Sequence, residues 1–98
     1  MVEAEIEQNI ANNKVMVYSK SSCPFCVRTK ALLQEKGAEF KVVELDQLGN
    51  GAQIQAALQA KTGQRTVPNI HINGEFVGGN SELQALNGNG ELDAKLAA

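Results

Sequence analysis

The chain has 98 residues, of which 43% are hydrophobic, and this amount of apolar material predicts one folded domain spanning residues 1–98. Nine basic and eleven acidic side chains give a formal charge of −2 and only 4% of the residues are aromatic, so the chain lacks the basic surface and stacking rings of a nucleic-acid binder. Its longest apolar runs are far shorter than the roughly 20 residues that span a bilayer, so we expect no nucleic-acid partner and no membrane partner.

Residues 3–12 predict a short helix with one apolar face. Ile6 and Ile10 are four positions apart and therefore share one side of a helix, and acidic residues in the first turn interact favourably with the helix dipole. This acidic segment differs from the basic start of secretory and transit peptides. We therefore expect a cytoplasmic protein in a reducing compartment, where a pair of nearby cysteines is more often catalytic or metal-binding than structural.

The next part of the chain predicts a strand, a helix and a second strand. Residues 15–18 and 40–45 are rich in strand-forming residues. Between them, Pro24 suits the first position of a helix that extends to about Lys36, and Gly37 suits its end. The apolar residues expected along this helix are Val27, Ala31, Leu32 and Leu33. This order predicts two parallel strands joined by a right-handed crossover.

The second half of the chain predicts a further helix, a β-hairpin and two short helices. Asn73-Gly74 is a strong signal for a hairpin turn, and Ser81 with Gln84 three residues later resembles a capping box. The expected elements are helix 52–61, strand 67–72, strand 75–77, helix 81–86 and helix 91–98. Because the hairpin strands must be antiparallel, the predicted fold is α/β, with a four-stranded mixed sheet flanked by helices.

The only two cysteines, Cys23 and Cys26, lie three positions apart at the start of the predicted second helix. A disulfide between them would close a very short loop and stabilise the fold little, so they are present for chemistry or by accident. Cys23 precedes Pro24 at the helix N-terminus, where free N–H groups and the helix dipole favour a thiolate. Cys26 lies one turn further in and is expected to be less exposed. We predict that Cys23 is the attacking thiol and Cys26 the resolving thiol.

A zinc site is the main metal-binding alternative for this cysteine pair. A structural zinc ion needs four ligands, and the chain offers only one further soft ligand, His71, inside a predicted strand. We therefore expect no metal and assign His71 no role. A Cys-x-x-Cys pair near a strand–helix–strand unit instead favours a thioredoxin-like redox site.

Three segments together resemble dithiol glutaredoxins of the thioredoxin superfamily. They are Lys20-Ser21-Ser22-Cys23-Pro24-Phe25-Cys26, Thr66-Val67-Pro68-Asn69-Ile70 and Gly78-Gly79-Asn80-Ser81-Glu82-Leu83. The resemblance covers nearly the whole chain and implies a thioredoxin-like fold and a glutathione-dependent thiol–disulfide oxidoreductase. The implied partners are glutathione and proteins that are glutathionylated or disulfide-bonded, with glutathione as co-substrate and no other cofactor. We expect a monomer.

The chain departs from the glutaredoxin pattern at two positions. Phe25 stands where the family more often has tyrosine, and Asn80 stands where many relatives carry a cysteine. A second regulatory disulfide is therefore not expected. Some glutaredoxins hold a [2Fe–2S] cluster between two subunits through their first cysteine and two glutathiones. Those relatives tend to have Gly or Ser at the position of Pro24, so the proline disfavours cluster binding, which is the competing hypothesis.

Glutathione carries a carboxylate at each end, and its predicted site has three parts. Near the cysteines, Lys20 offers a cation to the glycyl carboxylate, and the resemblance adds Gln55 and Arg65. In the middle, the residue before a proline is held extended, so Val67 can pair with an added peptide strand. Thr66 belongs to the same loop.

Pro68 and the segment after the hairpin complete the predicted site. Residue preferences alone favour a trans bond before Pro68, whereas the resemblance implies a cis proline that faces the active site. Gly79 lets the backbone approach the ligand, and Asn80 and Ser81 then open a helix whose free N–H groups suit the γ-glutamyl carboxylate. Phe25 is expected to form a partly exposed lip of the groove.

Overall fold

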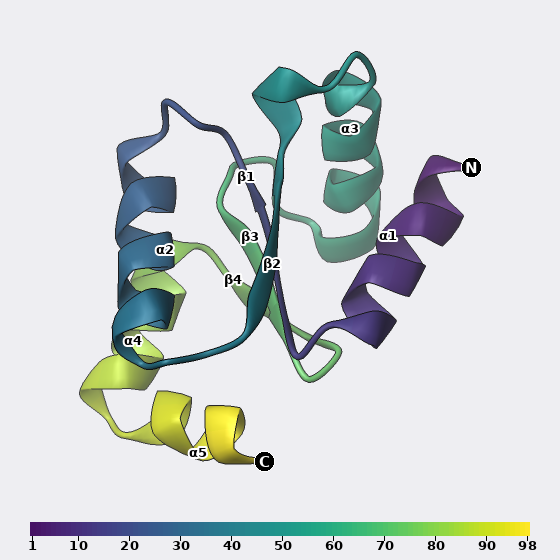
Figure 1. The fold of residues 1–98 in the computed structure, drawn as a ribbon. Coiled ribbons are helices and arrows are strands. Elements are labelled where there is room, and N and C mark those ends of the chain that lie inside the picture. Colours follow the sequence, from purple (N-terminus) through teal and green to yellow (C-terminus); the bar gives the residue numbers. More distant parts are fainter.

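A computed structural model describes residues 1–98 and has four strands that form one sheet between two groups of helices (Figure 1). In chain order the elements are α1 (Val2–Asn12), β1 (Val15–Ser19), α2 (Pro24–Glu35), β2 (Phe40–Glu44), the 3-10 helix η1 (Leu45–Gln47), α3 (Gly51–Thr62), β3 (Asn69–Ile72), β4 (Glu75–Gly78), α4 (Asn80–Gly88) and α5 (Glu91–Ala97). None of the helices combines the length and the apolar character needed to cross a bilayer.

The sheet has the strand order β2-β1-β3-β4 and is mixed, as the sequence predicted. Strand β1 pairs parallel with β2, with Val15 opposite Phe40. Strands β3 and β4 run antiparallel to their neighbours and are joined by the predicted turn, in which Asn73 and Gly74 both have positive φ. The carboxyl ends of β1 and β2 therefore lie at the same edge of the sheet, where α2 begins.

Helices cover both faces of the sheet, so alternate side chains of the buried central strand β1 point into two different cores. Helices α2, α4 and α5 cover one face, and α1 and α3 cover the other (Figure 1). Val15 and Val17 pack on the first side, and Met16 and Tyr18 pack on the second. Ile6 and Ile10 of α1 are buried in the second core, as their spacing predicted. A strand with every residue buried explains why its sequence shows a continuous apolar run instead of an alternation.

Two predicted strands are shorter in the structure than in the sequence-based prediction. Strand β3 begins at Asn69 because Pro68 has no N–H to donate to a ladder. Strand β2 ends at Glu44, and Leu45 begins η1 and is buried against α3. Gly51 allows this contact, since a Cβ atom there would lie 1.9 Å from the carbonyl oxygen of Leu45.

The predicted apolar side of α2 was partly wrong. Val27 is 53% exposed and Ala31 is also exposed. The residues of α2 that are buried are Cys26, Thr29, Leu32 and Leu33. A small thiol and a hydroxyl replace the expected aliphatic residues, so the buried side of this helix begins with a reactive group.

The predicted start of α4 was also wrong. Ser81 is not the N-cap and Gln84 does not complete a capping box. The helix begins at Asn80, and the backbone N–H of Gly79 donates to Oε1 of Glu82 over 2.6 Å. The carboxylate three residues after the cap therefore closes this helix end, and the helix extends to Gly88.

Candidate active site

Cys23 lies at the N-cap of α2, with Pro24 as the first helical residue. Its backbone is extended, and its Sγ atom accepts a hydrogen bond from the backbone N–H of Cys26 over 3.3 Å. A donor aimed at the sulfur stabilises a thiolate more than a thiol, and the free N–H groups of the first helical turn act in the same direction. The local geometry therefore suits Cys23 as a nucleophile.

Cys26 differs from Cys23 in exposure, and its burial changes its own pKa. Cys26 is fully buried, whereas Cys23 is partly accessible, and both thiols are free. Burial raises the pKa of the Cys26 thiol, and the hydrogen bond with Cys23 acts in the same direction. A buried thiol with a raised pKa beside a partly accessible thiol gives the pair the asymmetry that an attacking and a resolving thiol require.

The turn before Cys23 is held by a residue of η1, the short helix that follows β2. The backbone N–H of Cys23 donates to the carbonyl of Lys20 over 3.1 Å, which closes the turn. Asp46 accepts a 3.0 Å hydrogen bond from the N–H of Ser21 and a second one from its hydroxyl. These two bonds lower the pKa of the Asp46 carboxyl. No sequence pattern marked Asp46, because its partner is 25 positions away.

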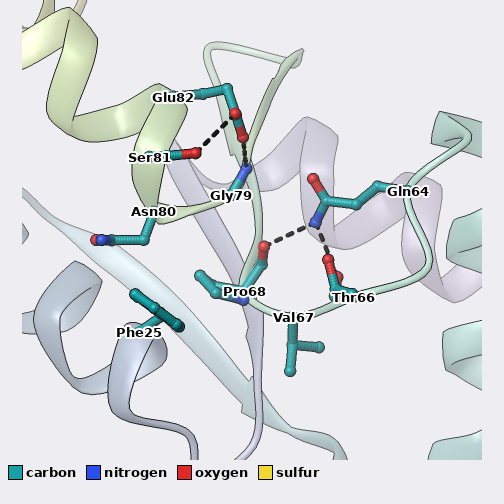
Figure 2. A pocket seen from close by; sticks show the side chains of 9 residues that line it. All are labelled: Phe25, Gln64, Thr66, Val67, Pro68, Gly79, Asn80, Ser81 and Glu82. Carbon is teal, nitrogen blue, oxygen red and sulfur yellow. Dashed lines mark hydrogen bonds between the residues drawn. The ribbon is translucent and has the colours of Figure 1, made fainter.

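A pocket of about 500 Å³ lies beside the cysteine helix (Figure 2). Its lining residues are Phe25, Gln64, Thr66, Val67, Pro68, Gly79, Asn80, Ser81 and Glu82. Seven of these nine belong to the predicted glutathione site, and they come from three distant segments of the chain. Phe25 is 55% exposed at the rim, as predicted, and the guanidinium of Arg28 lies 5.3 Å from the centre of its ring.

The middle of the pocket is formed by the loop before β3. The Val67–Pro68 peptide bond is cis, as the resemblance to glutaredoxins implied. The carbonyl oxygen of Val67 lies 3.9 Å from Sγ of Cys23, and the backbone N–H of Val67 has no partner within the protein. An extended peptide could therefore pair with Val67 while its sulfur lies beside Cys23.

Gln64 holds this loop in shape and was missed by the sequence analysis. Its Nε2 atom donates to the carbonyl oxygens of Thr66 and Pro68, both over 2.8 Å (Figure 2). One amide group thus satisfies two carbonyls on either side of Val67. A glutamine in a polar loop gives no periodic signal, so nothing in the sequence distinguishes this role from an exposed side chain.

The far end of the pocket is the start of α4. Glu82 accepts hydrogen bonds from the N–H of Gly79 and from the hydroxyl of Ser81, and these contacts lower the pKa of its carboxyl (Figure 2). The backbone N–H groups of Asn80 and Ser81 have no partner within the helix. This end therefore offers donors for a carboxylate and, beside them, an anionic group for an ammonium.

Three predicted site residues do not line the pocket. Lys20 lies in the turn before Cys23, and its side chain makes no hydrogen bond or ion pair. Gln55 donates its Nε2 to the carbonyl oxygen of Arg65 over 2.9 Å, so the two residues support the loop that leads to Thr66. The chain also places no group of three or more His, Cys, Asp or Glu side chains where they could hold a metal ion.

A dithiol at a helix N-terminus, facing a cis-proline loop on a four-stranded mixed sheet, defines a thiol–disulfide oxidoreductase of the thioredoxin-like fold. The comparisons with known proteins narrow this class. The family model described as Glutaredoxin matches residues 15–77. The chain belongs to the glutaredoxin family, and the predicted class of enzyme, a glutathione-dependent thiol–disulfide oxidoreductase, is confirmed.

Relatives and solved structures agree with this family over nearly the whole chain. The chain is 50% identical to Glutaredoxin-C6 of Oryza sativa subsp. japonica over 92 residues, which cover 94% of this chain and 82% of that protein. It is 45% identical to Glutaredoxin-2 of Schizosaccharomyces pombe, over 99% of this chain and 88% of that protein. A wheat glutaredoxin has a TM-score of 0.96 and 48% identity, covering 99% of this chain and 92% of that one.

One similar structure is a complex of buckwheat glutaredoxin with glutathione. It matches with a TM-score of 0.97 and 39% identity, over 99% of this chain and 88% of that chain. The predicted thioredoxin-like fold is confirmed by these matches.

Proposed function

We propose that this enzyme reduces protein–glutathione mixed disulfides and protein disulfides, with glutathione as its reductant. The observation that carries the proposal is the position of Cys23, whose sulfur accepts the N–H of Cys26 at 3.3 Å and lies 3.9 Å from the carbonyl of Val67. The solved complex of a similar buckwheat protein with glutathione supports the choice of ligand.

Glutathione lies along the pocket as an extended peptide. Its central cysteine pairs with the backbone of Val67, which brings its sulfur next to Cys23. Its γ-glutamyl carboxylate binds the free N–H groups of Asn80 and Ser81, and its ammonium lies near Glu82. Lys20, Gln55 and Arg65 act from outside the pocket lining, with the cation of Lys20 near the glycyl carboxylate.

Two routes use the cysteines differently. In the monothiol route the Cys23 thiolate attacks the glutathione sulfur of a mixed disulfide, and the protein leaves as a thiolate that takes up a proton. The thiolate of a second glutathione then attacks the Cys23–glutathione disulfide, which releases oxidised glutathione and restores Cys23. In the dithiol route Cys23 attacks a protein disulfide and Cys26 displaces the protein thiol, and two glutathiones reduce the resulting Cys23–Cys26 bond.

The proposal also covers the oligomeric state of the enzyme and the compartment in which it works. The enzyme works as a monomer in the cytoplasm, where reduced glutathione is abundant enough to serve as reductant. Its partners are glutathione and proteins with exposed mixed disulfides. Glutathione is the only co-substrate that this chemistry needs, since sulfur exchange requires no metal or organic cofactor.

Two serine variants, each assayed with glutathione, test the proposal. Cys23→Ser should abolish the reduction of a small glutathione mixed disulfide and of a protein disulfide, because both begin with attack by this sulfur. Cys26→Ser should keep the first activity and lose the second. An inactive Cys26→Ser with an active Cys23→Ser would contradict the roles, and visible absorbance after anaerobic purification would favour the competing cluster-binding hypothesis.

A further inference from the structure

A buried hydroxyl links the cysteine helix to the far end of the pocket. Thr29 is fully buried on α2, one turn after Cys26. Its hydroxyl donates its one side-chain hydrogen bond to Oδ1 of Asn80, over 3.1 Å and across 51 positions of sequence. A buried hydroxyl needs such a partner, but this partner belongs to the pocket lining instead of the core.

The second contact of Asn80 fixes the same end of its amide group. Nε2 of Gln84, one turn further along α4, also donates to Oδ1 of Asn80, over 3.4 Å. Both partners are donors to the oxygen, so the Nδ2 group remains without a partner in the protein. Figure 2 shows the Asn80 side chain at the start of α4, on the same side of the pocket as Phe25. A free amide donor is therefore held beside the N–H groups that open α4.

We propose that Thr29 is a positioning residue that orients the carboxamide of Asn80 so that its Nδ2 donates to the γ-glutamyl end of glutathione. This inference rests on the proposed function and deepens it. The hydroxyl of Thr29 never touches the ligand. It selects between two orientations of an amide that does, because an Asn80 turned by 180° would direct its oxygen toward a carboxylate and repel it.

Selectivity for the γ-glutamyl residue separates this role from a merely structural one. The probes are one peptide carrying a mixed disulfide with glutathione and the same peptide carrying cysteinylglycine, which lacks that residue. Thr29→Val keeps the shape of the side chain and removes the donor. It should lower the ratio of the two kcat/KM values about threefold to tenfold, the usual effect of one hydrogen bond. A general loosening of α2 would slow both substrates alike and leave the ratio unchanged.

The matched variants complete a double-mutant cycle. Thr29→Ser keeps the hydroxyl and should keep the ratio within about twofold of wild type. Asn80→Ala, at a partly exposed position, should lower the ratio, and adding Thr29→Val to it should lower it no further.

Three results would overturn the inference. An unchanged ratio for Thr29→Val, or an equal additional loss in the Asn80→Ala background, would overturn the positioning role while leaving the glutathione reaction intact. Equal kcat/KM values of the wild-type enzyme for the two peptides would instead overturn γ-glutamyl recognition itself, and with it this part of the proposed function.

Discussion

Polar side chains are buried on both faces of the sheet, but only on one face do they lie beside the catalytic cysteines. Under α2, the buried thiol of Cys26 lies beside Cys23, and the buried hydroxyl of Thr29 donates to Asn80. Under α1 and α3, the Tyr18 hydroxyl accepts a hydrogen bond from Asn9, and both ring nitrogens of His71 lack a partner. Buried polar groups therefore lie next to the reactive sulfur on the first face, whereas the unpartnered ring of His71 on the second face is expected to affect stability.

The largest effect expected on the second face is a loss of stability in acid. Burial lowers the pKa of His71 from 6.5 to about 4, and nearby Lys61 adds to this more than Glu7 opposes it. The fold therefore favours the neutral ring. This contribution is complete above pH 6.5 and is lost as the pH falls toward 4, which corresponds to about 3 kcal/mol.

Urea unfolding at several pH values measures this effect. The free energy of unfolding should fall between pH 6.5 and 4 in the wild-type protein and much less in His71→Leu, which removes the titrating ring. The activity of the two proteins at pH 7 should agree, since His71 lies outside the site. If the stability of the two proteins changed with pH in the same way, His71 would not be the group responsible. If His71→Leu lost activity at pH 7, the distinction between the two faces would be wrong.

The second-largest effect, on catalysis, is expected in the loop before β3 that lines the pocket. Gln64→Ala should remove the two hydrogen bonds that hold the carbonyls of Thr66 and Pro68, so the loop that presents Val67 becomes less ordered. We expect kcat/KM for a glutathionylated peptide to fall about tenfold, because the amide of Gln64 positions both carbonyl groups beside Val67. The effect on stability should be smaller. Gln59→Ala, at an exposed position of α3, is the control and should behave as wild type.

The sequence predicted the elements whose partners are close along the chain. Strand β1, helix α2 and the turn at Asn73 and Gly74 all depend on local preference and were correct within a few residues. The sequence predicts less well which side of a helix is buried, because long-range contacts determine it. Val27 is exposed because the sheet selects Cys26 and Thr29 for the buried side of α2, whatever the hydropathy of the helix.

In the candidate site, membership of a motif mattered more than the distance between partners along the chain. Motif resemblance indicated Thr66, Val67 and Pro68, and the structure brings all three to the pocket. The start of α4 is capped through Glu82 and not through Ser81 as predicted. The carboxylate of Glu82 reaches the N–H of Gly79 and accepts a charge-assisted hydrogen bond from it. The contacts of Gln64, Thr29 and Asp46 could not be predicted, since none of these three residues belongs to a motif or to a periodic pattern.

The smallest effect is expected at the turn before Cys23. Asp46 uses a different oxygen for each hydrogen bond to Ser21, so Asp46→Asn keeps an acceptor for only one of them. Because the turn stays closed by the backbone of Lys20, kcat/KM should fall only about threefold. The matched control is Asp93→Asn, whose carboxylate pairs with Lys36 on the surface away from the site.

The pH dependence of this turn follows from the lowered pKa of Asp46. Its hydrogen bonds favour the carboxylate, so their contribution is present above the ordinary carboxyl pKa and is lost as the pH falls through the lowered value. The rate ratio of wild type to Asp46→Asn should therefore shrink in acid. A ratio that is constant with pH would contradict a role for the charge.

Mass spectrometry of the trapped intermediate tests most directly the claim that Cys23 attacks and Cys26 resolves. Cys26→Ser mixed with oxidised glutathione should accumulate one glutathione per molecule, attached to Cys23, because no second thiol can displace it. Wild type under the same conditions should give the Cys23–Cys26 disulfide. A stable glutathione adduct on Cys26 in Cys23→Ser, with none on Cys23 in Cys26→Ser, would contradict the account.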